Sequence, residues 1–240
     1  MATGKYGNFT TQIGRIPFSD KDCMLFNPEE MDGITAAYQF DKVQVKALYG
    51  RWTAFNKLDM EGSAVDNYKV DTLGLHVDYQ ADKLGIGAAF YNHSYKDTNL
   101  HKDHVNVWDI MASYKFAPEW KIAGQYIGAN ESVGGESKNG YQFRLTYGGD
   151  SYKVSKKGAY LVSANYFKVP MAASFNGGLP FEDAVGLTDA GQVGIKGWSL
   201  NGMYNIESNI KLYAGYTDYK GLQDNAQKRK VVTTYVQFYF

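Results

Sequence analysis

The sequence contains a single cysteine and only five prolines in 240 residues. One cysteine excludes a disulfide framework and a thiolate metal site, and we interpret Cys23, in the polar segment 19–23, as an incidental free thiol. No stretch approaches the roughly 18 consecutive apolar residues that a membrane-spanning helix requires. The first residues also lack a charged region followed by an apolar one. We therefore expect either that a signal peptide has been removed or that the chain begins inside a longer protein.

The sequence also has no excess of charge, because 25 Lys and Arg balance 25 Asp and Glu. The net charge therefore gives no reason to expect nucleic acid or an anionic membrane surface as a partner. No run of serine, glycine or charged residues marks a linker, so we predict a single domain over residues 1–240.

Aromatic residues and glycine are abundant, with 20 Tyr, 13 Phe and 26 Gly. Aromatic residues make up 15% of the chain, yet the mean hydropathy is −0.41. A soluble core this rich in aromatic residues would normally bring more Leu and Ile with it. A β-barrel in lipid explains both values, because its aromatic girdles face outward while its interior stays polar.

Apolar and polar residues alternate with a period of two along most of the chain. Residues 71–80 place Leu73, Leu75, Val77 and Tyr79 on one face and Thr72, Gly74, His76, Asp78 and Gln80 on the other. Such alternation over about ten residues is typical of a tilted strand that crosses a membrane. Similar segments fall near 5–17, 32–42, 43–55, 71–82, 84–96, 105–116, 120–130, 139–149, 158–169, 195–206, 210–220 and 229–240.

The links between these segments alternate in length. Short links fall at 41–42, 81–83, 117–119 and 207–209, and long polar links fall at 18–31, 56–70, 97–104, 131–138, 170–194 and 221–228. Short turns on one rim and long loops on the other are typical of outer-membrane barrels. The link near 149–157 is longer than a tight turn and does not fit this pattern.

The segment lengths distinguish a barrel in lipid from a soluble sandwich. Strands of soluble sheets average about five or six residues, whereas these segments run to about ten. We therefore predict an all-β fold, a transmembrane antiparallel up-and-down β-barrel of about twelve strands. Its first strand would run outward from a periplasmic N-terminus.

The C-terminal residues Val236, Phe238 and Phe240 share one face. They resemble the terminal-strand signal that the outer-membrane assembly machinery reads, although Thr234 stands near the place where that signal often has a glycine. This resemblance implies the barrel assembly machinery as a partner.

Residues 7–18, a polar loop and then Met31-Asp32-Gly33-Ile34 resemble the barrel part of OmpM-type porins of diderm Firmicutes, which carry an N-terminal S-layer homology domain. The resemblance covers nearly the whole chain and implies a trimeric pore. The N-terminal domain is absent from this sequence, and a family barrel of about sixteen strands would lack its first few strands here.

In most of the predicted strands polar residues occupy every second position, and we expect this polar set to face the lumen. A lipid-facing Arg or Lys near the midplane would cost about 2–4 kcal/mol. Cations slightly outnumber anions in this set, which indicates a weak anion preference. The predicted pore-lining residues are Gln44, Lys46, His76, Asp78, Asp109, Lys115, Lys121, Gln125, Gln142, Arg144, Asn165, Asn201, Lys211 and Thr217. In the longest link, Phe175, Phe181, Glu182 and Asp183 belong to a loop that either folds inward as a constriction or lies over the mouth.

No constellation of residues indicates catalysis, a metal or a cofactor. His93-Ser94 is the only adjacent pair suited to a membrane-embedded hydrolase, and no oxyanion loop is near it. His101, Asp103 and His104 are best interpreted as solvated loop residues rather than metal ligands.

We therefore expect a non-enzymatic porin of the bacterial outer membrane for passive diffusion of ions and small hydrophilic solutes. The expected partners are outer-membrane lipids and lipopolysaccharide, with a homotrimer as a further possibility. The alternatives are a channel selective for acidic oligosaccharides, the membrane-embedded hydrolase, and a plugged structural barrel or adhesin that conducts nothing.

Overall fold

The computed structural model describes residues 1–18, 29–53, 69–95, 104–132, 137–148, 156–170, 194–222 and 228–239. These residues form thirteen strands and contain no helix that is long and apolar enough to cross a membrane. The strands are β1 (Ala2–Tyr6), β2 (Phe9–Phe18), β3 (Glu29–Phe40), β4 (Val43–Thr53), β5 (Lys69–Gln80), β6 (Leu84–Tyr95), β7 (His104–Ala117), β8 (Trp120–Ala129), β9 (Asn139–Gly148), β10 (Tyr160–Val169), β11 (Ile195–Glu207), β12 (Ile210–Gly221) and β13 (Lys228–Phe238).

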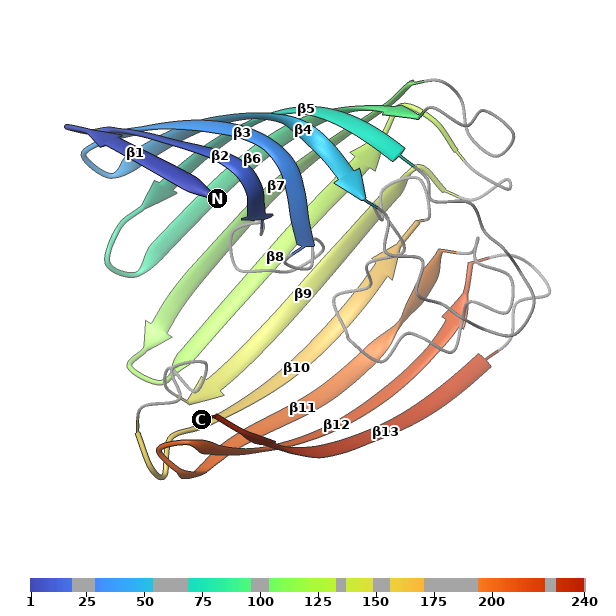
Figure 1. Ribbon diagram of the computed structural model, residues 1–240. Helices are drawn as coiled ribbons and strands as arrows, with labels where there is room; N and C mark the ends of the chain where they lie inside the picture. The colour runs from blue at the N-terminus through green and yellow to red at the C-terminus, as the bar shows by residue number, and fades with distance from the viewer. Residues whose placement is uncertain are drawn as a thin grey trace.

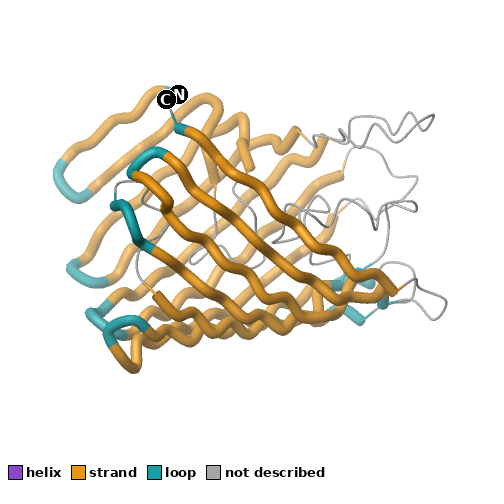
Figure 2. The backbone as a smooth tube through the Cα atoms, turned by 90° about the horizontal axis from the view of Figure 1, so that it is seen from below, coloured by secondary structure: helices purple, strands orange, loops and turns teal. Residues whose placement is uncertain are grey.

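Every strand pairs with its sequence neighbour in one antiparallel sheet of order β1 to β13. Figure 1 shows this sheet curling round a central axis, and Figure 2 shows the short turns gathered at one end. Consecutive antiparallel pairing is the up-and-down topology that the alternation predicts. The prediction of an all-β up-and-down fold is therefore confirmed. Among the described strands β1 and β13 do not pair with each other, so each leaves one outer edge.

The first predicted segment contains two strands rather than one. A two-residue turn at Gly7-Asn8 separates β1 from β2, and Gly7 adopts a φ of +58°. Glycine reaches positive φ without a steric penalty, and tight hairpins need it there. The additional strand β1 therefore runs toward the short-turn rim, whereas β2, which makes up most of the predicted first segment, runs toward the long links.

The connection from β9 to β10 remains longer than the other turns on its rim. Its described part is tied to β11, because Gly158 N donates to Asn205 O at 2.8 Å and Asn205 N donates to Ala159 O at 2.8 Å. The exposed Lys157 forms an ion pair with Glu207, and this hydrogen bond raises the pKa of Lys157.

Aromatic side chains form two girdles on the exposed outer face. Near the short turns, Trp120 contacts Tyr147 with ring centroids 4.6 Å apart, and Tyr147 contacts Tyr160 at 5.6 Å. Nearer the long links, Tyr141 stacks on Tyr166 at 6.0 Å. Tyr160 and Tyr166 are six residues apart on β10, which corresponds to about 20 Å along a strand. Two such girdles mark the interfaces of a membrane-spanning barrel.

Close packing on the outer face fixes Trp108 over Gly128. The two residues are cross-strand partners, and a Cβ at Gly128 would lie 2.4 Å from a carbon of the Trp108 ring. We expect Gly128→Val to displace this ring and to lower the free energy of unfolding by about 1–3 kcal/mol, as overpacking does. Urea unfolding from lipid vesicles, followed by tryptophan fluorescence, measures this change.

Gly202→Val is the matched control, because a Cβ at Gly202 would meet nothing nearer than 3.8 Å. We expect this variant to unfold at the wild-type urea concentration or above it, because Val favours a strand more than glycine does. Equal unfolding midpoints for the two variants would contradict the packing assigned to Trp108.

Candidate functional site

The candidate site is the concave face of the curled sheet. Side chains alternate between the two faces, so that on β10 Ser163 and Asn165 are buried whereas Val162 and Tyr166 are exposed. The exposed parity carries the girdles, and the buried parity faces the axis round which the sheet curls. We call the face that carries the buried parity the concave face.

The structure places every predicted pore-lining residue on this concave parity. Their exposure ranges from fully buried Gln142 to exposed Lys115. The residues concerned are Gln44, Lys46, His76, Asp78, Asp109, Lys115, Lys121, Gln125, Gln142, Arg144, Asn165, Asn201, Lys211 and Thr217.

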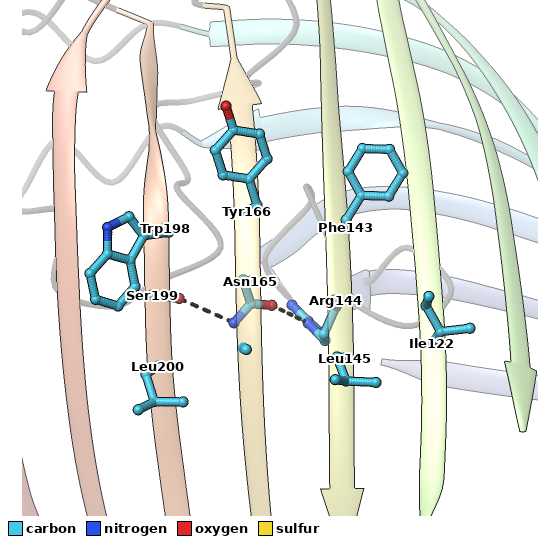
Figure 3. A pocket seen from close by; sticks show the side chains of 10 residues that line it. Ile122, Phe143, Arg144, Leu145, Asn165, Tyr166, Trp198, Ser199 and Leu200 are labelled. Atoms are coloured by element: carbon cyan, nitrogen blue, oxygen red, sulfur yellow. Dashed lines mark hydrogen bonds between the residues drawn. The ribbon is translucent and has the colours of Figure 1, made fainter. Parts of the chain in front are cut away.

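A hydrogen-bonded network crosses the concave face from β9 to β12. Arg144 Nε donates to Asn165 Oδ1 at 2.7 Å, and Asn165 Nδ2 donates to Ser199 Oγ at 3.1 Å (Figure 3). Asn201 Nδ2 also donates to Ser199 Oγ at 3.1 Å, and Tyr213 OH donates to Asn201 Oδ1 at 2.9 Å. Because each member holds the next, these polar side chains present a fixed hydrophilic wall. Ser199 and Tyr213 belong to this wall but were missed among the predicted residues.

Cationic side chains outnumber anionic ones on the described concave face. Lys115 and Lys121 are direct cross-strand partners on β7 and β8, which concentrates positive charge at one place. The anionic residues are Asp78 and Asp109, and the cationic residues are Lys5, Lys46, Lys115, Lys121, Arg144, Lys211 and Arg229. Lys5 and Arg229 were not among the predicted residues.

An apolar band occupies the concave face near the long-link ends of the strands. Its members include Tyr91, Phe167 and Tyr219, whose side chains are at most 2% exposed. These buried side chains pack against one another as one cluster across neighbouring strands. The prediction did not include this band. Among the described residues its buried members are Ile16, Met31, Leu48, Ala89, Tyr91, Val105, Val107, Ile127, Ala129, Phe167, Val169, Ile195 and Tyr219.

The adjacent pair His93-Ser94 does not form a site, because neighbouring strand residues point to opposite faces. His93 is buried on the concave side, where its Nδ1 lies 2.8 Å from Thr72 Oγ1. Ser94 lies on the outer face with its Oγ 2.9 Å from His104 Nδ1. Ser94 and His104 are direct cross-strand partners at the long-link rim, a contact that the sequence spacing did not predict.

Other predicted residues lie on β13 or outside the described residues. Val236 and Phe238 share the outer face of β13. Phe240 of the assembly signal, Cys23, His101 and the loop residues Phe175, Phe181, Glu182 and Asp183 lie outside the described residues. Within the described ranges, no three His, Cys, Asp or Glu side chains are grouped to hold a metal ion.

Solved structures share this fold at low sequence identity. A mutant of the Rh. blastica porin matches with a TM-score of 0.57 and 12% identity, over 98% of this chain and 75% of that chain. Outer-membrane expressed OmpT of Vibrio cholerae matches with a TM-score of 0.57 and 15% identity, over 98% of this chain and 78% of that chain. The chain therefore has the fold of outer-membrane β-barrels. No family model and no curated protein sequence matches it.

Asn165 is the centre of the concave network and is only 4% exposed. We expect Asn165→Leu to lower the free energy of unfolding by about 1–3 kcal/mol, because Arg144 loses an acceptor and Ser199 loses a donor. Urea unfolding from vesicles tests this. The matched control is Thr146→Val on the neighbouring strand β9, where the half-buried hydroxyl bonds to no other described residue. An Asn165→Leu variant as stable as this control would contradict the role of the network.

Proposed function

We propose that the protein is an outer-membrane porin that forms a water-filled channel for passive diffusion of ions and small hydrophilic solutes. The observation that carries this proposal is that alternate residues of the strands form two different faces. The outer face is apolar and carries two aromatic girdles, and the concave face is largely polar. Charged groups such as Lys46, Lys121 and Arg144 on the concave face favour hydration there. Porins among the solved structures with this fold support the same function.

The buried apolar band supports a channel that is narrow at its long-link end. We propose that solutes meet the band first and the hydrogen-bonded wall of Arg144, Asn165 and Ser199 next. The outer-membrane location, the surrounding lipids and lipopolysaccharide, the assembly machinery and a homotrimer belong to the same proposal. The resemblance to OmpM-type porins supports the trimer.

The excess of concave cations supports a preference for anions. Seven cationic side chains stand against two anionic ones on the described part of this face. The same excess favours acidic oligosaccharides as a more specific substrate class. In the proposed channel these solutes would slow the ionic current by occupying the cationic wall.

Conductance in a planar bilayer of zwitterionic lipid tests the channel and its selectivity together. We expect steady unitary steps and a reversal potential in a salt gradient that shows anion preference. Lys121→Glu with Arg144→Glu replaces two positive charges by two negative ones on the concave wall. This double variant leaves the described concave face nearly balanced in charge, so it should remove most of the anion preference.

The matched control is Lys196→Glu with Lys220→Glu, which makes the same change of charge on the outer face of β11 and β12. It should keep the wild-type reversal potential. A folded wild-type protein that inserts and passes no current would overturn the channel, and identical potentials for the two double variants would overturn the concave ion path.

A further inference from the structure

Four lysines form one row across the outer face of β10 to β13. Lys168 pairs with Lys196, Lys196 with Lys220, and Lys220 with Lys228 as direct cross-strand partners. Neighbouring strands are about 4.8 Å apart, so the row concentrates four positive charges within about 15 Å. Like charges directly opposite each other destabilise a sheet, which leaves this row in need of an anion.

The described residues supply little negative charge to this row. The carboxylate of Asp218 lies 3.9 Å from Lys228 Nζ, and Lys230 is the direct cross-strand partner of Asp218. The ammonium groups of Lys168, Lys196 and Lys220 bond to no residue in the described part of the chain. One carboxylate therefore faces five lysines.

The corresponding outer rim on β2 to β5 is built differently. There Arg15, Asp32, Arg51 and Asp71 are successive cross-strand partners, so the charges alternate. Arg15 Nε lies 3.0 Å from Asp32 Oδ1, and Arg51 Nε lies 2.6 Å from Asp71 Oδ1. This row neutralises itself. Because the whole chain is also neutral, the lysine row is a local concentration and not a consequence of a basic protein.

The lysine row lies at the depth of lipid headgroups. Tyr166 and Trp198, which are direct partners in the girdle nearer the long links, stand two residues before Lys168 and two residues after Lys196 along their strands. Tyr and Trp side chains settle at the membrane–water interface. The lysines therefore lie one row farther out, on the polar side of that interface, where lipid phosphates are found.

An apolar groove begins directly below the row on the same face. Ala164 lies between its cross-strand partners Leu145 and Leu200, and its small side chain leaves a groove of about 350 Å³. Figure 3 shows Phe143, Tyr166 and Trp198 on the strands around this groove. Ala164 is four residues from Lys168, about 13 Å along the strand. This geometry suits an acyl chain that descends from a headgroup at the lysines.

We propose that β10 to β13 form a specific binding site for a phosphate-bearing anionic lipid of the leaflet at the long-link rim. The lysine row binds the phosphate, and the groove at Ala164 holds an acyl chain. Each Lys near a membrane surface attracts anionic lipid, and the groove adds a contact that a free phosphate ion cannot make. The site does not depend on whether the channel conducts.

Native mass spectrometry of the folded protein, released from micelles doped with phosphatidylglycerol or phosphatidylcholine, tests the site. We expect phosphatidylglycerol to be retained and phosphatidylcholine to be lost. Lys168→Gln, Lys196→Gln and Lys220→Gln together should weaken phosphatidylglycerol binding on the order of tenfold or more. The control combines Lys42→Gln, Lys83→Gln and Lys156→Gln at the short-turn rim, which removes the same charge and should retain the lipid.

Ala164→Leu tests the contribution of the groove separately from that of the lysines. It fills the groove without changing the charge, so it should also weaken phosphatidylglycerol binding. In a second experiment, inorganic phosphate at the same concentration as the lipid should not displace the lipid from the wild-type protein. Equal retention of both lipids by the wild-type protein would overturn the proposal. Equal loss of lipid from the two triple variants would likewise overturn it.

Discussion

The hydrogen bonding of the backbone is the constraint on which the rest of the structure depends. In an apolar medium every N–H and C=O group must find a partner within the protein, and consecutive antiparallel strands provide one at each residue. The twelve pairings from β1 to β13 meet this requirement along most of the described sheet. The exceptions are the two outer edges, where β1 covers only Phe9–Ile13 of β2, and the two register shifts near Lys115 and Asn205. An open edge in hydrocarbon costs several kcal/mol for each unpaired group. A conducting state therefore requires both edges to be hydrogen-bonded.

Strand pairing also explains why so much was predictable from the sequence. A strand has a period of two, so the polar residues of one parity must share a face, and all of the residues predicted to line the pore lie on it. The position of a residue in the alternating pattern predicts its face of the sheet but not whether other side chains cover it. Tyr91 and Phe167 lie on the polar parity, yet they are buried in an apolar band because of packing that no single strand reveals. The turn at Gly7 was missed for a related reason, since one glycine within an alternating segment does not distinguish a turn from a strand.

Register across strands was the part that the sequence could not provide. Ser94 meets His104 because β6 and β7 pair with one particular offset, and the length of the link between them leaves several offsets open. The lysine row depends on three such offsets at once. The neutral total charge concealed it, because that total gave no reason to expect an anionic membrane surface as a partner. A sum over the chain says nothing about which charges become neighbours.

The two rows of charged residues on the outer rim differ in what can cover them. The alternating row from Arg15 to Asp71 satisfies its own charges, so the face below it, with exposed Ile34 and Tyr49, can be covered by another protein surface without leaving a charge unpaired. The lysine row can be covered only by something that carries negative charge. A lipid on β10 to β13 and a second copy of the chain on the same strands exclude each other. If both the lipid site and the homotrimer exist, the contact between subunits therefore lies outside β10 to β13, and the side of β2 to β5 is suited to it because its rim charges are already paired.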